Sequence, residues 1–320
     1  MQKDTYADIK KKSTRGSLLL LLTAFIWGVA FVAQSVGMKY VGPFTFTAVR
    51  NYIVVLILLP LLGLLDRSSG QTQDGPAASD TAFHILPASG RDRKRLLQAG
   101  ILSGALLAAA SCLQQIGIKY TTVGKAGFIT AMYIILVPLL GIFLKKKPGV
   151  RLWISVGLAI AGLYLLCLAG GRVSLGAGDL LELCCAFFFA LQIMAIDHYA
   201  PMVDGIRMAW LQFLVCAVLS TVPALIFEDI SLTGLLAAWK PLLYAGALSS
   251  AVGYTLQIIA QKDTDPVVAS LLMSLESSFS LLAGWVILGQ KLSARELSGC
   301  GLMFLAIMLA QIPAKNRQKA

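Results

Sequence analysis

The sequence predicts an all-α integral membrane protein of ten transmembrane helices, arranged as two inverted five-helix repeats. Three observations lead to this fold class. The chain of 320 residues is 57% hydrophobic and only 13% charged, whereas a soluble domain carries about a quarter charged residues. The apolar residues gather into ten runs of the length that crosses a bilayer as a helix. The second half of the chain also repeats motifs of the first.

Ten apolar spans follow one another along the chain. They are residues 17–36, 44–65, 96–118, 124–144, 152–169, 179–199, 206–227, 241–260, 267–288 and 294–312. The short connectors contain helix-stop signals such as Pro148-Gly149 and Asp265-Pro266. One connector differs from the rest, because residues 66–95 are polar and rich in Gly, Pro and Ser, which predicts a mobile loop.

The placement of lysine and arginine predicts how the chain lies in the membrane. With the N-terminus inside, the cytoplasmic segments carry about 19 of the 27 Lys and Arg residues, and the outer segments about 7. We therefore expect a multi-pass protein of the plasma membrane (the bacterial inner membrane) with both termini in the cytoplasm. The predicted parts are a cytoplasmic N-terminus (1–16), a first repeat (17–169, including the cytoplasmic loop 66–95), a second repeat (176–312) and a cytoplasmic tail (313–320).

The internal repeat has a definite register. Residues 99–103 (AGILS) match 245–249 (AGALS), and Gln114 falls on Gln257. The spans 124–144 and 267–288 keep this register, so Tyr133 falls on Glu276. Because five spans is an odd number, the second copy enters the membrane upside down. Inverted repeats of this kind are common in secondary transporters, whose substrate site lies near the midplane between the halves.

A single ionisable residue, Glu276, lies near the middle of the span 267–288. An ionised carboxylate at that depth costs a few kcal/mol or more, so this span is predicted to be an inner helix rather than one that faces lipid. Glu276 is the candidate coupling residue, either as a proton carrier or as a counter-charge to the substrate. The alternative is that it forms one half of a buried structural pair.

Polar side chains on other spans predict a cavity between the two halves. In the span 241–260 and just beyond it, Ser250, Tyr254, Gln257 and Gln261 recur at helical spacing. Hydrogen bonds between helices, without a cavity, are the alternative explanation. The candidate substrate-binding residues are Trp27, Gln34, Gln114, Tyr133, Gln192, Tyr254 and Gln257.

The remaining polar residues at depth are given structural roles. Arg50, in the outer third of its span, is predicted to be a structural charge that snorkels or binds helix ends. Asp179 and Glu182 match a capping box at the start of the span 179–199. The six cysteines fall inside apolar runs without metal spacing, so neither a metal site nor a cofactor is predicted.

Four segments carry a resemblance to a known family: 24–32 (AFIWGVAFV), 47–51 (TAVRN), 126–141 (AGFITAMYIILVPLLG) and 269–293 (ASLLMSLESSFSLLAGWVILGQKLS). With the two repeats, they resemble the EamA group of the drug/metabolite transporter (DMT) superfamily. The resemblance implies a carrier that moves small metabolites or drugs by alternating access, commonly outward. The family usually has Pro after the position of Glu276, where this chain has Ser277.

The expected function is therefore that of a permease that exports small organic metabolites or drugs, and not that of an enzyme. Its expected partners are a small-molecule substrate, protons as a candidate coupling ion and the lipid bilayer, with no nucleic acid and no obligate protein partner. A passive channel and an intramembrane enzyme are the alternatives. The enzyme would need catalytic groups at membrane depth, whereas His84 lies in a loop and His198 at a span end.

Overall fold

The computed structural model describes residues 2–70, 90–120, 123–143, 149–167, 176–288 and 294–311. Within these ranges the chain is helical and contains no strand. The elements are α1 (Gln2–Gly37), α2 (Pro43–Gly70), α3 (Gly90–Tyr120), α4 (Val123–Thr130), α5 (Tyr133–Phe143), α6 (Val150–Cys167), α7 (Ala177–Tyr199), α8 (Gly205–Phe227), α9 (Leu232–Ala237), α10 (Trp239–Leu243), the π-helix η1 (Tyr244–Tyr254), α11 (Thr255–Gln261), α12 (Pro266–Met273), α13 (Glu276–Leu288) and α14 (Ala294–Gln311).

Seven helical segments in the described ranges are long and apolar enough to cross a membrane. Three shorter apolar helices, Tyr133–Phe143, Val150–Gly162 and Leu297–Ala306, lie where the sequence predicts further spans. The protein is therefore an all-helical, multi-pass membrane protein. Exposed apolar side chains cover the outside of the bundle, such as Leu56, Phe143 and Leu225, and they suit contact with lipid.

Helix starts follow the capping signals of the sequence. The carboxylate of Asp204 accepts hydrogen bonds from the backbone N–H groups of Ile206 and Arg207 and so begins α8. Asp265 accepts one from the N–H of Val267 at 2.8 Å, with Pro266 as the first residue of α12. These caps bond N–H groups that have no partner inside their own helix, and they place the turns at the ends of the bundle.

Three predicted boundaries were wrong, because helices extend past the apolar spans. The helix α2 continues to Gly70 and α3 begins at Gly90, so the predicted loop 66–95 is too long at both ends. Helix α1 likewise begins at Gln2, well before the predicted span. Hydropathy marks the part of a helix that suits lipid, whereas good helix formers such as lysine continue it into water. Residues 71–89 and the predicted tail 313–320 lie outside the described residues.

Two helices are interrupted at equivalent positions of the repeat. The span 123–143 breaks between Thr130 and Tyr133, and the span 266–288 breaks between Met273 and Glu276, a constant offset of 143 residues. The backbone bonds also correspond, since the N–H groups of residues 132 and 275 both bond three residues back, as in a 3₁₀ turn. The second interruption corrects the prediction of one continuous helix over 267–288.

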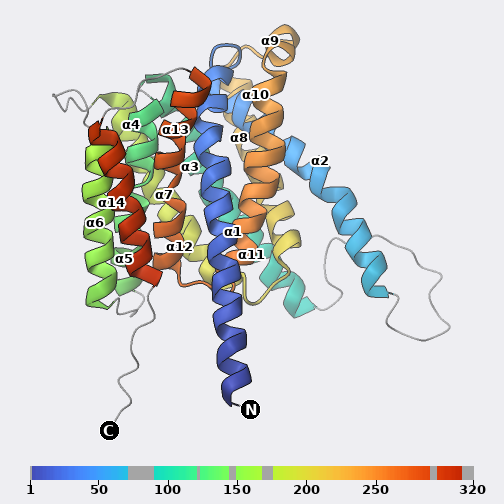
Figure 1. Cartoon of the computed structure of the whole chain (residues 1–320). Coiled ribbons are helices and arrows are strands. Elements are labelled where there is room, and N and C mark those ends of the chain that lie inside the picture. The colour runs from blue at the N-terminus through green and yellow to red at the C-terminus, as the bar shows by residue number, and fades with distance from the viewer. Residues whose placement is uncertain are drawn as a thin grey trace.

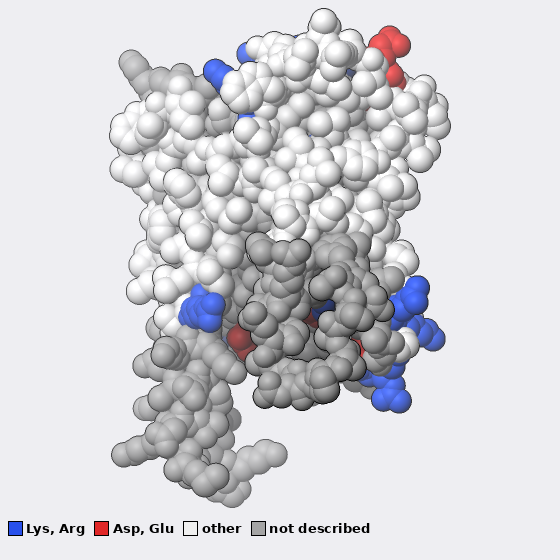
Figure 2. All heavy atoms as spheres, turned by 90° about the vertical axis from the view of Figure 1, so that its right-hand side faces the viewer, with Lys and Arg blue, Asp and Glu red and all other residues white. Residues whose placement is uncertain are grey.

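Helix contacts pair the two halves of the chain. Helix α1 packs against α13 as α7 packs against α4 and α5, while α2 packs against α8 and α6 against α14. Figure 1 shows α6 and α14 side by side at the left of the bundle and α1 crossing its centre. On the face shown in Figure 2, the visible Lys, Arg, Asp and Glu atoms lie toward the upper and lower parts of the bundle, with a band of uncharged side chains between them.

Candidate functional site

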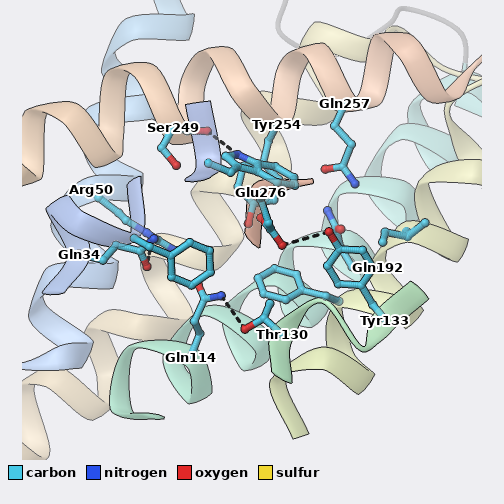
Figure 3. A pocket seen from close by; sticks show the side chains of 14 residues that line it. Gln34, Arg50, Gln114, Thr130, Tyr133, Gln192, Ser249, Tyr254, Gln257 and Glu276 are labelled. Atoms are coloured by element: carbon cyan, nitrogen blue, oxygen red, sulfur yellow. Dashed lines mark hydrogen bonds between the residues drawn. The ribbon is translucent and has the colours of Figure 1, made fainter. Parts of the chain in front are cut away.

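A buried pocket lies at the centre of the bundle, where helices of both halves meet. Its volume is about 30 Å³. It is lined by Trp27, Phe31, Gln34, Arg50, Gln114, Thr130, Tyr133, Phe189, Gln192, Ile193, Ser249, Tyr254, Gln257 and Glu276. All nine residues singled out from the sequence, including Arg50 and Glu276, belong to this lining. Figure 3 shows their side chains converging from several helices. Position alone does not assign a role to any of them.

The two interrupted helices meet in this pocket. The hydroxyl of Tyr133 donates a hydrogen bond of 3.0 Å to Oε1 of Glu276, and both side chains are buried. Each residue is the first of its half-helix, α5 and α13 respectively. Nearby, the hydroxyl of Ser277 donates to the backbone carbonyl of Gly127 at 2.8 Å. Side chains beside the two breaks therefore bond across the pocket and join the two halves. Uninterrupted helices would not bring these side chains together in this way.

Arg50 is a buried cation in the pocket wall, with 3% of its surface exposed. Its Nη1 donates to Oε1 of Gln34 at 3.4 Å, and its Nε has no hydrogen-bond partner in the described part of the chain. No described carboxylate forms an ion pair with it. Burying a charge without a partner is costly, so the guanidinium is available to a carbonyl or anionic group that enters the pocket. This placement adds Arg50, predicted as a structural charge, to the residues that face the pocket.

Aromatic rings form one wall of the pocket. Tyr254 lies between Trp27, at a ring-centroid distance of 4.6 Å, and Phe213, at 5.6 Å. The indole Nε1 of Trp27 donates to the backbone carbonyl of Ser249 at 3.0 Å. The hydroxyl oxygen of Thr23 lies 2.9 Å from the carbonyl oxygen of Leu19, one turn earlier in α1, and 3.3 Å from that of Gly253 in η1. The indole of Trp27 thus ties α1 to the π-helix η1, and Tyr254 at the end of η1 lines the pocket.

The π-helix changes which residues share a face with Tyr254. At the α-helical spacing used for the sequence prediction, Ser250 falls on the face of Tyr254, four residues away. Between Tyr244 and Tyr254 the helix is wound as a π-helix, in which bonds span five residues. Ser249, five residues before Tyr254, therefore lines the pocket and Ser250 does not. The predicted stripe is corrected at this position, since helix winding cannot be read from residue spacing.

Amide atoms of two glutamines in the pocket have no hydrogen-bond partner in the described part of the chain. Gln192 and Gln257 are each only 1% exposed. Both amide atoms of Gln192 and the Oε1 of Gln257 lack a hydrogen bond within the described ranges. Buried polar groups are nearly always hydrogen-bonded, so these atoms are suited to a polar solute or to water. Gln114 differs, because its Nε2 donates to the hydroxyl of Thr130 at 3.3 Å.

The sequence prediction missed five lining residues. They are Phe31, Thr130, Phe189, Ile193 and Ser249. Thr130 lies three residues before Tyr133, about one helical turn, so a search one turn away from this predicted site residue would have identified it. The three apolar residues carry no signal that separates a pocket wall from ordinary core packing. Ser249 lines the pocket only because of the π-helix, and nothing in the sequence indicates this.

The predicted capping box at the start of α7 was wrong. The helix begins at Ala177, so Asp179 is its third residue and accepts a bond from the N–H of Gly176 at 2.9 Å. Glu182 lies one turn further in and is fully buried. Its Oε2 accepts a hydrogen bond of 2.9 Å from the hydroxyl of Thr130. The box failed because the helix starts two residues earlier than the apolar pattern indicates.

The bundle of membrane-crossing helices, the two interrupted helices and the buried polar pocket together define a multi-pass transport protein. Residues 14–168 and 176–311 each match the model of the EamA-like transporter family. The chain belongs to this family and is therefore a membrane transporter of the DMT type. The same family model thus matches the chain twice.

Two similar proteins were found, one by sequence and one by structure. The chain is 28% identical over 306 residues to a protein of Archaeoglobus fulgidus named "Uncharacterized transporter", covering 94% of this chain and 87% of that protein. A solved structure described as "Crystal structure of protein" superposes with a TM-score of 0.71 at 18% identity. The superposition covers 93% of this chain and 96% of the other, so the two chains share a fold.

Proposed function

We propose that the protein is a secondary carrier that moves small organic metabolites or drugs outward across the plasma membrane by alternating access. The observation that supports this most directly is the hydrogen bond between Tyr133 and Glu276. It lies where two interrupted helices meet in a buried pocket. Half-helices that meet at the substrate and ion site are a recurring construction of secondary transporters.

Alternating access requires two halves that can rock against each other. The equal offset of the two interruptions and the matching helix contacts favour two five-helix repeats of inverted orientation. In this arrangement the pocket lies between the repeats, with α4 and α5 from one and α12 and α13 from the other. Ten membrane crossings then return the chain to its starting side. In Figure 1, α1 begins and α14 ends at the same end of the bundle, and the Lys/Arg asymmetry makes that side the cytoplasm.

The size of the pocket favours a carrier over a channel. A volume of about 30 Å³ has room for about two water molecules, whereas ligand sites for drug-sized molecules occupy about 300 Å³ or more. A metabolite can therefore enter only if the helices around the pocket separate. A channel would need a continuous aqueous path across the membrane. A central pocket too small for the solute suits a protein whose helices must move to admit it.

The lining indicates the chemistry of the solute. Arg50 and the amides of Gln192 and Gln257 are suited to carbonyl, carboxylate or other acceptor and donor groups. The rings of Trp27 and Tyr254 are suited to an apolar or flat portion of the same molecule. A small amphipathic metabolite with a hydrogen-bonding end fits this combination. A purely hydrocarbon solute would leave the polar groups without partners.

Glu276 is proposed as the coupling residue. Its carboxyl group is buried and accepts a hydrogen bond from Tyr133. At membrane depth the neutral, protonated carboxyl group is less costly than the carboxylate anion. Binding of substrate and of a proton would therefore alternate at this group, or each would shift the affinity for the other. A proton gradient then drives net export of the substrate.

Reconstitution in liposomes tests the proposal. Purified protein is assayed for flux of radiolabelled amino acids, nucleosides, amines and small carboxylates, with and without a pH gradient. We expect at least one compound to show saturable flux, exchange stimulated by unlabelled compound on the far side, and accumulation driven by the gradient. Flux that does not saturate and is not stimulated by exchange would instead favour a channel. No flux of any compound above that of empty liposomes would contradict the proposal.

A further inference from the structure

A second carboxyl group, that of Glu182, is buried beside the central pocket. Its side chain is fully buried, and its Oε2 accepts a hydrogen bond of 2.9 Å from Thr130, which lines the pocket. Its other oxygen, Oε1, has no partner in the described part of the chain. That oxygen faces Gly117 of α3, where an added Cβ would lie only 2.5 Å away. The glycine makes the room that the carboxyl group occupies.

The surroundings of Glu182 favour a neutral carboxyl group. No described Lys, Arg or His side chain forms an ion pair with it. A buried carboxylate without a cation is costly, and it avoids that cost by holding a proton. The titratable groups close enough to Glu182 to interact with it electrostatically are Asp179 and Cys185 of α7 itself and Glu276 of α13 across the pocket. Lys119 and Tyr120 end the packed helix α3, where Tyr120 lies against Gly178 of α7. Lys119, the cation among them, lies exposed at the end of α3.

Glu182 also lies between the pocket and one end of the bundle. It is the sixth residue of α7, about one turn beyond Asp179, which caps the helix start. On its inner side, the hydroxyl of Thr130 donates to Glu182 and accepts from the Nε2 of Gln114. Both Thr130 and Gln114 line the central pocket (Figure 3). A chain of hydrogen bonds therefore runs from the pocket to a carboxyl group near the outer end of α7.

We propose that Glu182 is a second proton-binding residue of the carrier, placed between the outer face and the central pocket and connected to the pocket through Thr130. This inference rests on the proposed proton-coupled function. A proton from water at the outer face binds the carboxylate. It passes inward when Glu182 donates it to the Thr130 oxygen while the Thr130 hydroxyl hydrogen moves to a water in the pocket. Glu182 returns to the anion, Thr130 is restored, and the proton reaches the site of Glu276.

Infrared spectroscopy tests proton binding without any substrate. The purified, full-length protein is titrated with pH, and the C=O stretch of protonated carboxyl groups is recorded. We expect a band that Glu182→Gln removes, that Thr130→Val shifts because the hydrogen bond is lost, and that Asp229→Asn leaves unchanged. Asp229 is the matched control, because it is an exposed carboxylate at the end of α8. If Glu182→Gln removes no band at any pH, the residue does not bind a proton and the proposal is wrong.

Transport in liposomes then tests the role of that proton. With the compound found in the flux assay, we expect Glu182→Gln to slow pH-gradient-driven transport by about a hundredfold, the lower end of the range for a positioned proton-transfer group. Thr130→Val, which keeps the size of the side chain, should act in the same direction. Glutamine can still accept the Thr130 bond, so folding is expected to survive. Normal gradient-driven transport by both variants would overturn the proposal.

The two experiments separate failure of this inference from failure of the proposed function. If the wild-type protein shows no gradient-driven flux, the carrier mechanism fails, and with it the relay of protons to Glu276. The infrared titration still decides whether Glu182 binds a proton. If wild-type flux is coupled but the Glu182 variants behave normally, the carrier function stands and only the second proton site is excluded.

Discussion

The hydroxyl of Tyr133 bonds Oε1 of Glu276 at 3.0 Å, and these residues occupy equivalent positions in the two repeats. One copy thus supplies a neutral donor where the other supplies a carboxyl group. The bond crosses between the halves at the two helix interruptions. Any motion that separates the halves at the pocket must stretch or break it, so the protonation of Glu276 and the closure of the pocket are expected to be linked.

Removing this bond should weaken closure of the pocket. Tyr133→Phe deletes the hydroxyl and keeps the ring, and it leaves a buried carboxyl group without its donor, at a cost of about 1–3 kcal/mol. We expect a lower thermal-unfolding midpoint in detergent and slower gradient-driven flux in liposomes. Tyr40→Phe, at an exposed tyrosine, is the control. Unchanged stability together with unchanged flux would show that the bond has no role.

Neutralising Glu276 tests coupling. Glu276→Gln keeps the shape of the side chain and removes its proton-binding group. Uphill transport driven by a pH gradient is expected to be lost, whereas downhill exchange of substrate is expected to survive, because rocking of the halves needs no net charge movement. Both are measured as liposome flux, with Asp229→Asn as the control. Near-normal accumulation by the variant would mean that Glu276 is not the coupling residue.

A pocket glutamine separates binding from folding. Gln257 has an unpaired carbonyl oxygen at the pocket and occupies the position equivalent to Gln114. Gln257→Ala should reduce flux more than it reduces the yield of folded protein in the membrane. Gln98→Ala, at an exposed glutamine of α3, should change neither quantity. Parallel loss of yield and flux in the Gln257 variant would indicate a structural role for the amide.

Outside the pocket, Glu228 holds together two helix ends. Its carboxylate accepts hydrogen bonds from the backbone N–H groups of Phe44 and Thr45 at 2.8 and 2.7 Å. Glu228→Ala removes both acceptors from the start of α2, and a lost cap of this kind costs about 1–2 kcal/mol. We expect a lower unfolding midpoint with substrate affinity unchanged. A large change in affinity at normal stability would contradict a purely structural role.

Topology is tested by labelling intact cells. The Lys/Arg asymmetry predicts that the connector between α2 and α3, residues 71–89, lies in the cytoplasm. Single cysteines introduced there, in a variant whose native cysteines are replaced, should resist an impermeant thiol reagent until the cells are permeabilised. A cysteine at the exposed Asp229, on the opposite side by the same topology, should label at once. Efficient labelling of the loop in intact cells would reverse the orientation.

The sequence by itself determined the membrane class, the presence of many apolar helical spans and the family, because these depend on hydropathy and on motifs that are local in the chain. It also identified nine residues that line one pocket, since polar groups are costly at membrane depth and few positions in the spans carry them. Glu276, with its repeat equivalent Tyr133, is the clearest example. No tertiary information is needed to notice a lone carboxyl group in an apolar span.

Only the tertiary structure decided how these residues meet. Residue spacing does not reveal the two helix interruptions. It also does not reveal the π-helix, which turns Ser249 rather than Ser250 toward the pocket. Each feature depends on bonds made to other helices. The indole of Trp27, for example, bonds the carbonyl of Ser249 more than 200 residues away in the chain. Glu182 was mistaken for a cap because α7 begins earlier than the apolar pattern indicates, and its real partner could not be read from the sequence either. Its partner Thr130 comes from a different helix, and contacts between helices are set by packing in three dimensions rather than by neighbours in sequence.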